Sequence, residues 1–276
     1  MTGVTCAVCP HRCHLQEGQT GLCRARSNID GKIHCDNYGL ITSMALDPIE
    51  KKPLLHFFPG SSILSVGSFG CNLHCPFCQN YEISMADSSH STSTYVSPDS
   101  LVSKALAMMP KGNIGIAFTY NEPFIGYEYV YDCSVLAHKN ALKTVLVTNG
   151  YVNEEPLTAL LPYVDAMNID LKTFSEDYYK RLGGSLEDVK RTITLSQPKC
   201  HIEITTLIVP GENDTEQEMK QLSEWIAGIS PDIPFHVSRF FPRYKMTDRK
   251  ATNTDTVYRL AKIARRSLHF VHEGNC

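Results

Sequence analysis

The chain has 276 residues, of which 42% are hydrophobic and 20% are charged, and its formal net charge is −3 at pH 7. This composition excludes a disordered chain, and without a basic excess it gives no clear indication of a nucleic-acid partner. No apolar run approaches the roughly 20 residues of a membrane span and the N-terminus lacks a secretory pattern, so we expect a cytoplasmic protein that does not contact a membrane.

The first sixty residues differ from the rest of the chain. Residues 1–60 hold a cysteine cluster, several glycines and only short apolar runs. We interpret them as a small Cys-rich metal-binding subdomain with a linking segment. Within it, residues 33–37 and 40–44 are expected to pair as a hairpin.

From residue 61 onward, short apolar strands alternate with helices. In chain order we expect a strand at 63–66, a helix at 98–109, a strand at 114–118, a helix at 124–139, a strand at 144–147, a helix at 154–161, a strand at 166–169, a helix at 186–195, a strand at 202–209, a helix at 215–226, a strand at 235–237, a helix at 254–265 and a strand at 269–271. This alternation predicts an α/β fold, in which residues 61–276 form a partial, open (β/α)6 barrel. Ligands of such sheets bind at the carboxyl ends of the strands.

Cysteine is the most informative residue type, because the chain has 11 cysteines and is long enough to need no disulfides. Three of them, Cys71, Cys75 and Cys78, lie in one loop directly after the first strand of the larger domain. A zinc site would need a fourth ligand, for which His74 is the nearby candidate. Alternatively, three thiolates can hold a [4Fe–4S] cluster and leave one iron open for chemistry.

Several further segments accompany this loop, and together they extend over nearly the whole chain. They are residues 9–13 (Cys-Pro-His-Arg-Cys), 18–23, 47–60, 70–80, 119–123 (Thr-Tyr-Asn-Glu-Pro), 168–172 (Asn-Ile-Asp-Leu-Lys), 209–211 and 236–242. In this combination the chain resembles the radical S-adenosylmethionine (SAM) enzymes of the pyruvate formate-lyase-activating-enzyme group. It is most similar to the subfamily called the AmmeMemoRadiSam system radical SAM enzyme.

The resemblance implies an oxidoreductase that works under anaerobic conditions. Its [4Fe–4S] cluster, on Cys71, Cys75 and Cys78, binds S-adenosylmethionine and cleaves it reductively, and the resulting 5′-deoxyadenosyl radical abstracts a hydrogen atom. Strand-end residues would bind the cofactor, and by resemblance these are Asn121, Glu122, Thr148, Asn149, Asp170, Lys172 and His236.

The N-terminal cluster supplies four thiols, from Cys6, Cys9, Cys13 and Cys23. Four thiolates complete the ligand set of either zinc or a second iron–sulfur cluster, and the spacing does not decide between them. Because four ligands leave no open position, we expect this site to be structural.

Three functions remain open at this point. The leading one is an activating enzyme that installs a radical on a glycyl radical protein and receives electrons from a flavodoxin- or ferredoxin-like donor. The second is a radical SAM enzyme that acts on a small molecule, a peptide or a nucleic acid, with residues 1–60 as a lid. The third is a non-catalytic, metal-tied interaction module.

Overall fold

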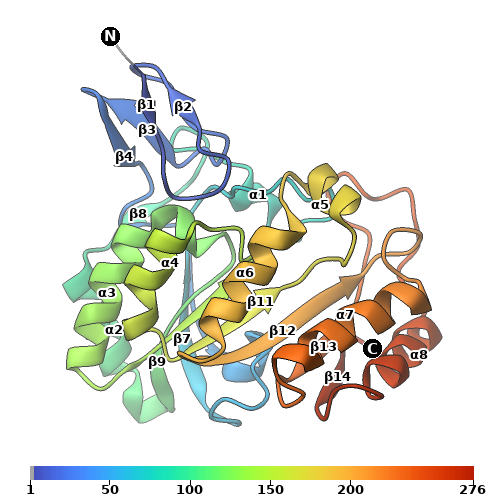
Figure 1. Ribbon diagram of the computed structural model, residues 1–276. Coiled ribbons are helices and arrows are strands. Elements are labelled where there is room, and N and C mark those ends of the chain that lie inside the picture. The colour runs from blue at the N-terminus through green and yellow to red at the C-terminus, as the bar shows by residue number, and fades with distance from the viewer. Residues whose placement is uncertain (1–2) are drawn as a thin grey trace.

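The computed structural model describes residues 3–276 as an α/β fold around one curved sheet (Figure 1). Within these residues the sheet has eight strands, of which seven pair in parallel while β6 pairs antiparallel with β7 at one edge. Their order is β6 (Ser43–Pro48), β7 (Ser62–Gly67), β9 (Asn113–Phe118), β10 (Lys143–Thr148), β11 (Ala166–Asp170), β12 (His201–Ile208), β13 (Phe235–Arg239) and β14 (Val271–Gly274). The expected fold class is confirmed, with seven parallel strands in the described chain instead of six.

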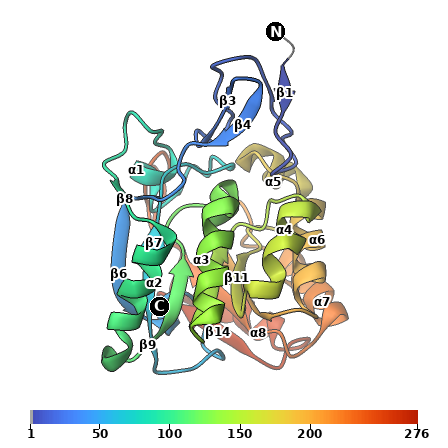
Figure 2. The same cartoon turned by 90° about the vertical axis from the view of Figure 1, so that its left-hand side faces the viewer.

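Longer helices cover the outer face of this sheet, whereas the short helices α1 and α5 lie above it, near the N-terminal subdomain (Figures 1 and 2). In chain order, the helices are α1 (Tyr81–Ser84), α2 (Pro98–Ala107), α3 (Tyr127–Lys139), α4 (Glu154–Leu160), α5 (Glu176–Leu182), α6 (Leu186–Ser196), α7 (Glu216–Ile229) and α8 (Thr254–Ala264). Residues 3–276 also contain four short turns of 3-10 helix, at Ile49–Lys51, Met109–Lys111, Pro123–Gly126 and Leu161–Tyr163. Local sequence explains their starts: the Ser97 side chain accepts a hydrogen bond from the Ser100 N–H, and Pro98 occupies the first turn of α2.

The N-terminal subdomain stands above one end of the sheet (Figure 1). It consists of two small hairpins, β1 (Val4–Thr5) with β2 (His14–Leu15) and β3 (Arg26–Ile29) with β4 (Lys32–Cys35). The expected hairpin of residues 33–37 and 40–44 is wrong. Asp30 and Gly31 both have positive φ and form the turn between β3 and β4, whereas β5 (Leu40–Ile41) pairs with β8 (Thr94–Tyr95).

The expected boundary at residue 60 also needs correction. Strand β6 belongs to the central sheet, because residues 43–48 pair with β7. The segment that follows, residues 49–57, enters the base of the barrel, and we call it the strap. Its apolar side chains Ile49, Leu54 and Phe57 are buried. They pack in one cluster with residues of β7, β9, β10 and β11, namely Ile63, Ala117, Val145 and Ala166. The strap is therefore part of the larger domain's core.

A buried carboxylate fastens the strap to the sheet. Glu203 on β12 accepts hydrogen bonds from the backbone N–H groups of Leu55 (3.0 Å) and His56 (2.7 Å). Its carboxylate also contacts His201 Nε2 at 3.0 Å and His236 Nε2 at 2.6 Å. Burial by itself raises the pKa of Glu203, but these hydrogen bonds outweigh it and lower the pKa from 4.5 to about 2.

This lowered pKa predicts a pH-dependent contribution to stability. The contribution is present above about pH 4.5 and is lost as the pH falls toward 2, because the folded state holds the ionised form more strongly than the unfolded state does. A shift of this size corresponds to about 3 kcal/mol, of which about 2 kcal/mol should be lost between pH 7 and pH 3.

Urea unfolding of the metal-free protein at both pH values tests this prediction. The difference in unfolding free energy between the parent and Glu203→Gln should shrink by about 2 kcal/mol at the lower pH. Glu155→Gln, which changes an exposed carboxylate, is the control. A difference that stays constant with pH would show that Glu203 does not ionise as the hydrogen bonds indicate.

Candidate active site

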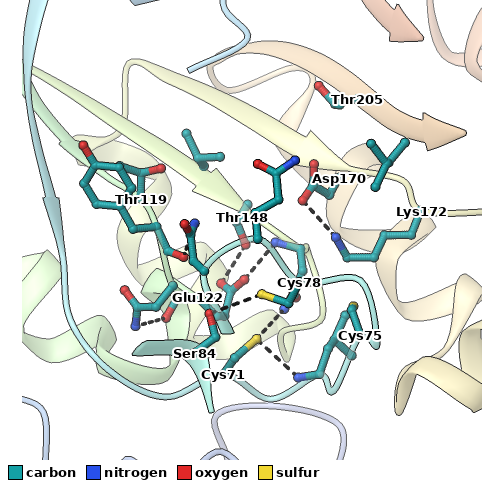
Figure 3. Close-up of a pocket in the computed structure, with 18 of the residues that line it drawn as sticks. Cys71, Cys75, Cys78, Ser84, Thr119, Glu122, Thr148, Asp170, Lys172 and Thr205 are labelled. Carbon is teal, nitrogen blue, oxygen red and sulfur yellow. Dashed lines mark hydrogen bonds and ion pairs between the residues drawn. The ribbon is translucent and has the colours of Figure 1, made fainter. Parts of the chain in front are cut away.

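The three-cysteine loop leaves the carboxyl end of β7 through a sharp turn at Gly70. This residue has φ of +85°, and a Cβ there would lie 2.5 Å from the carbonyl oxygen of Cys23. Only glycine fits both constraints. Beyond it, Cys71, Cys75 and Cys78 line one cavity of about 290 Å³, and Figure 3 shows them on one side of that cavity.

His74 does not join these thiols. Its side chain is exposed and lies against Gly183, where a Cβ would approach the imidazole to 2.4 Å. A fourth ligand for tetrahedral zinc is therefore not offered by His74. The donor set of three thiols in one loop instead suits a [4Fe–4S] cluster with one open iron.

Two of the three thiols, those of Cys71 and Cys75, lose their protons less readily than an ordinary thiol does. Burial, followed by the nearby Glu122 carboxylate, raises the pKa of Cys71 well above its ordinary value. Burial also raises the pKa of Cys75 to about 11, although the Lys172 ammonium partly opposes this shift. Since iron binds the thiolate form, cluster assembly here releases protons.

Glu122 links the ends of two neighbouring strands. Its Oε1 accepts hydrogen bonds from the Thr148 hydroxyl (2.7 Å) and the Phe124 N–H (3.1 Å), and its Oε2 accepts one from the Asn149 N–H (2.8 Å). Burial nevertheless raises its pKa to about 7, because those hydrogen bonds only partly offset the loss of water. A carboxylate can accept about four hydrogen bonds, so one lone pair of Oε2 remains for a cationic or N–H group in the cavity.

Two asparagines fix the loop next to Glu122. The Asn149 side-chain amide donates to Asn72 Oδ1 at 2.9 Å and lies 3.6 Å from the sulfur of Cys71. Asn121 accepts from the Ser68 N–H at 2.9 Å and donates to the carbonyl of Gly70 at 3.2 Å. Asn121 thus lines the cavity, but its side-chain amide is hydrogen-bonded to the backbone around the cysteine loop.

Asp170 is the last residue of β11, and its carboxylate forms an ion pair of 2.9 Å with Lys172, two residues further on, at the cavity wall. Burial alone would lower the pKa of Lys172, but the Asp170 carboxylate and the Cys75 thiolate outweigh burial and raise it. The two side chains point to the same side, as their spacing of two residues in an extended segment predicts. Figure 3 shows the pair beside the cysteine loop.

His236 does not line this cavity, so its expected place beside the cofactor is corrected. It is the second residue of β13, near the amino end of the strand, and its ring is engaged with Glu203 at the base of the barrel. Ser238, two residues further along the same face, does line the cavity. An inward-facing residue must lie close to the carboxyl end of its strand to reach the ligand side.

Other lining residues escaped the sequence analysis. They include Pro53, Phe77, Tyr120, Thr205, Leu207 and Ser238. Thr205 and Leu207 alternate along the second half of β12, so strand periodicity together with the strand-end rule signals them. Tyr120 has φ of +72°, a left-handed backbone conformation that is rare for tyrosine and that the sequence therefore does not predict.

The N-terminal cysteines gather as well. Cys6, Cys9, Cys13 and Cys23 line one small pocket, and burial raises the pKa of Cys9 to about 12 and that of Cys23 to about 11. In residues 3–276, however, no three His, Cys, Asp or Glu side chains are arranged as ligands of a single metal ion. The pocket adjoins the active-site loop, because the Cys71 N–H donates to the Cys23 carbonyl at 3.2 Å.

With this geometry in place, the sequence can be compared with known families. The sequence model of the Radical SAM superfamily matches residues 65–226, from β7 into α7. The chain belongs to this superfamily. It is therefore an enzyme of radical chemistry, and the family implies a [4Fe–4S] cluster and S-adenosylmethionine as cofactors. This assignment excludes the non-catalytic interaction module. In residues 3–276, none of the helices is both long and apolar enough to cross a membrane.

The chain is similar to an uncharacterized protein over almost its whole length and, more weakly, to activating enzymes. The chain is 38% identical over 275 residues to the uncharacterized protein MJ0808 of Methanocaldococcus jannaschii. This match covers 99% of this chain and 81% of the relative. It is 23% identical over 205 residues to the pyruvate formate-lyase-activating enzyme of Staphylococcus epidermidis, covering 70% of this chain and 79% of that enzyme. The similarity to pyruvate formate-lyase-activating enzymes is thus distant.

Among solved structures, Streptococcus suis SuiB bound to the precursor peptide SuiA matches with a TM-score of 0.60 and 16% sequence identity. The match covers 82% of this chain and 51% of the SuiB chain. At this identity the likeness shows a shared fold.

Glu122 provides a test of the cavity as the cofactor site. Glu122→Gln keeps the size of the side chain but loses the negative charge, and it leaves one of the three N–H or O–H donors around it without an acceptor. We expect S-adenosylmethionine to bind at least about tenfold more weakly, the loss typical of a hydrogen bond to a charged group.

Anaerobic equilibrium dialysis of the reconstituted protein measures this affinity, and iron content serves as the check that the cluster is intact. Glu154→Gln, an exposed carboxylate outside the cavity, is the matched control. Equal affinity of parent and Glu122→Gln would remove Glu122 from the cofactor site.

Proposed function

We propose that this protein reductively cleaves S-adenosylmethionine at a [4Fe–4S] cluster held by Cys71, Cys75 and Cys78, and that the organic radical formed serves to abstract a hydrogen atom from a glycine of a partner protein. The observation that supports this most directly is the convergence of three thiols and several strand-end polar side chains on one open cavity. When bound, the cluster and S-adenosylmethionine supply the one-electron chemistry that no side chain can provide.

The surrounding residues bind and orient. Glu122 places a buried carboxylate at the ends of β9 and β10, where it suits the amino group of the cofactor. The Lys172 ammonium, held by Asp170, suits a carboxylate. Asn149 and Thr148 complete this side of the cavity, and Asn149 also reaches the sulfur of Cys71.

A protein substrate is supported by the open mouth of the cavity. Of residues 3–60, Pro53 lines the cavity, and none of the residues of the hairpins β1–β2 and β3–β4 does. Relatives named as activating enzymes of pyruvate formate-lyase and isethionate sulfite-lyase support the same choice. Within the superfamily we propose that the chain belongs to the AmmeMemoRadiSam subfamily. A flavodoxin- or ferredoxin-like protein would supply the electron.

Anaerobic reconstitution with iron and sulfide, followed by reduction with dithionite, tests this function. The parent should form 5′-deoxyadenosine. A variant with Ala at Cys71, Cys75 and Cys78 should form none and should hold about four fewer irons per chain. Added glycyl radical protein from the same organism should increase 5′-deoxyadenosine formation and acquire an electron paramagnetic resonance signal of a glycyl radical. Stimulation by a peptide, a small molecule or RNA instead, without that signal, would contradict the activating role.

We propose further that the four N-terminal cysteines hold a structural metal, zinc or a second iron–sulfur cluster. In support, their thiols surround one pocket and leave no position for a substrate. A Cys6→Ser/Cys9→Ser variant should lose this metal and become sensitive to limited proteolysis only in the N-terminal segment, while it keeps the radical-SAM cluster. A variant that resists proteolysis but no longer accepts electrons would instead make the site a redox relay.

A further inference from the structure

The strap has a second side, which faces the active-site cavity. Pro53 lines the cavity directly, and Tyr120, another lining residue, donates its hydroxyl to Asp47 at 2.8 Å. Lys52, in the strap, donates to the same carboxylate at 2.8 Å, and its ammonium lies 4.9 Å from the centre of the Tyr120 ring. Pro53 is therefore the floor of the cavity, and Lys52 supports the neighbouring Tyr120 through Asp47.

A second set of contacts holds this floor against β11 and β12. The Asn168 side-chain amide donates to the Pro53 carbonyl at 2.8 Å and to the Thr205 hydroxyl at 2.9 Å. Thr205 itself lines the cavity, and Figure 3 shows it at the end away from the cysteines. The cysteines, Glu122 and Asn149 occupy the other end, and Asp170 pairs with Thr205 in the sheet. The floor thus lies away from the cysteine loop, and it is there that we place the substrate.

The position of the floor depends on Glu203. Its carboxylate binds the strap at Leu55 and His56, which begin two residues after Pro53. Its side chain is completely buried and receives the N–H groups of Leu55 and His56. His201 and His236 contact the same carboxylate from β12 and β13. No other described side chain hydrogen-bonds two consecutive backbone N–H groups of the strap.

The far end of the strap is tied to the last strand. His56 Nε2 lies 2.8 Å from His272 Nε2 on β14, and the His272 ring lies 5.5 Å from the ring of His236. The strap, β12 and β13 thus meet at the Glu203 carboxylate, and β14 joins them through His272. This also gives a role to His236, which does not reach the cofactor side.

We propose that Glu203 is a positioning residue for the substrate: by holding the strap at Leu55 and His56, it fixes the position of Pro53, which forms the cavity floor. This proposal rests on the proposed function, in which the cavity is the place of radical chemistry. Glu203 acts through the strap and touches neither the cofactor end nor the reacting atoms. Its loss should therefore affect substrate and leave S-adenosylmethionine cleavage intact.

The first measurement is amide hydrogen exchange of the reconstituted holoenzyme, followed by mass spectrometry. Glu203→Gln offers one acceptor oxygen where two N–H groups need one each, so exchange in residues 52–58 should rise at least about tenfold while the rest of the sheet stays protected. Glu203→Asp keeps the charge and both oxygens and should give an intermediate result. Asp165→Asn is the control, because Asp165 also accepts a backbone N–H at 2.9 Å, from Thr144, but does not touch the strap.

The second measurement separates positioning from general destabilisation. In Glu203→Gln, 5′-deoxyadenosine formed with dithionite and no substrate should stay within about twofold of the parent, whereas radical transfer to the glycyl radical protein should fall at least about tenfold; Glu203→Asp should restore part of it. Unchanged exchange in the strap overturns the proposal. So does an equal loss of substrate-free cleavage, or the same pattern in Asp165→Asn. If the parent cleaves S-adenosylmethionine but transfers no radical to that protein, the proposed substrate fails, and the exchange result alone decides whether Glu203 fixes the floor.

Discussion

Parallel pairing of the strands is the constraint on which the rest of this structure depends. Because β7 and β9 to β14 all run in one direction, their carboxyl ends meet at the same edge, and the loops that follow them converge. The cysteine loop, Glu122, Asn149 and Asp170 come from four different strand ends, yet they line a single cavity. The amino ends converge equally, and the strap closes that end with apolar side chains.

Buried charge is the second theme, and each case is compensated in a different way. Glu122 is compensated by one hydroxyl and two backbone N–H groups, which leave its pKa raised to about 7. Asp170 and Lys172 compensate each other. Glu203 receives two backbone N–H groups and two imidazoles, and its pKa falls to about 2. An ionised group inside a protein persists only with such partners, so these clusters also fix the positions of the segments that supply them.

The N-terminal subdomain is coupled to the active site through the backbone. Cys23 accepts the N–H of Cys71, and His11 Nε2 lies 2.8 Å from the carbonyl oxygen of Asn72. Asn72 in turn accepts from Asn149 on the cofactor side. The subdomain therefore contacts the cysteine loop, and the residues of its two hairpins do not line the cavity.

The sequence by itself determined the parallel α/β fold, the three-cysteine loop and most of the strand-end residues. These features depend on local patterns: the alternation of apolar strands with helices, the spacing of thiols within one loop, and the rule that polar residues after parallel strands share an edge. Glu122, Asn149 and Asp170 could be placed at the site for that reason. The Asp30–Gly31 turn was also a local signal, one that the expected hairpin at residues 33–44 overlooked.

Only the tertiary structure decided where the strap lies, that β6 joins the sheet, and which end of the barrel His236 faces. Glu203 binds the N–H of Leu55 across 148 residues of sequence, and no local pattern announces a pairing at that separation. Likewise, His236 and Ser238 lie on the same face of β13. His236, near the amino end of the strand, contacts Glu203, whereas Ser238, nearer the carboxyl end, lines the cavity. These positions depend on hydrogen bonds between buried polar groups of segments that are far apart in the chain. Such partners come together only in the folded molecule, so a local sequence pattern does not reveal them.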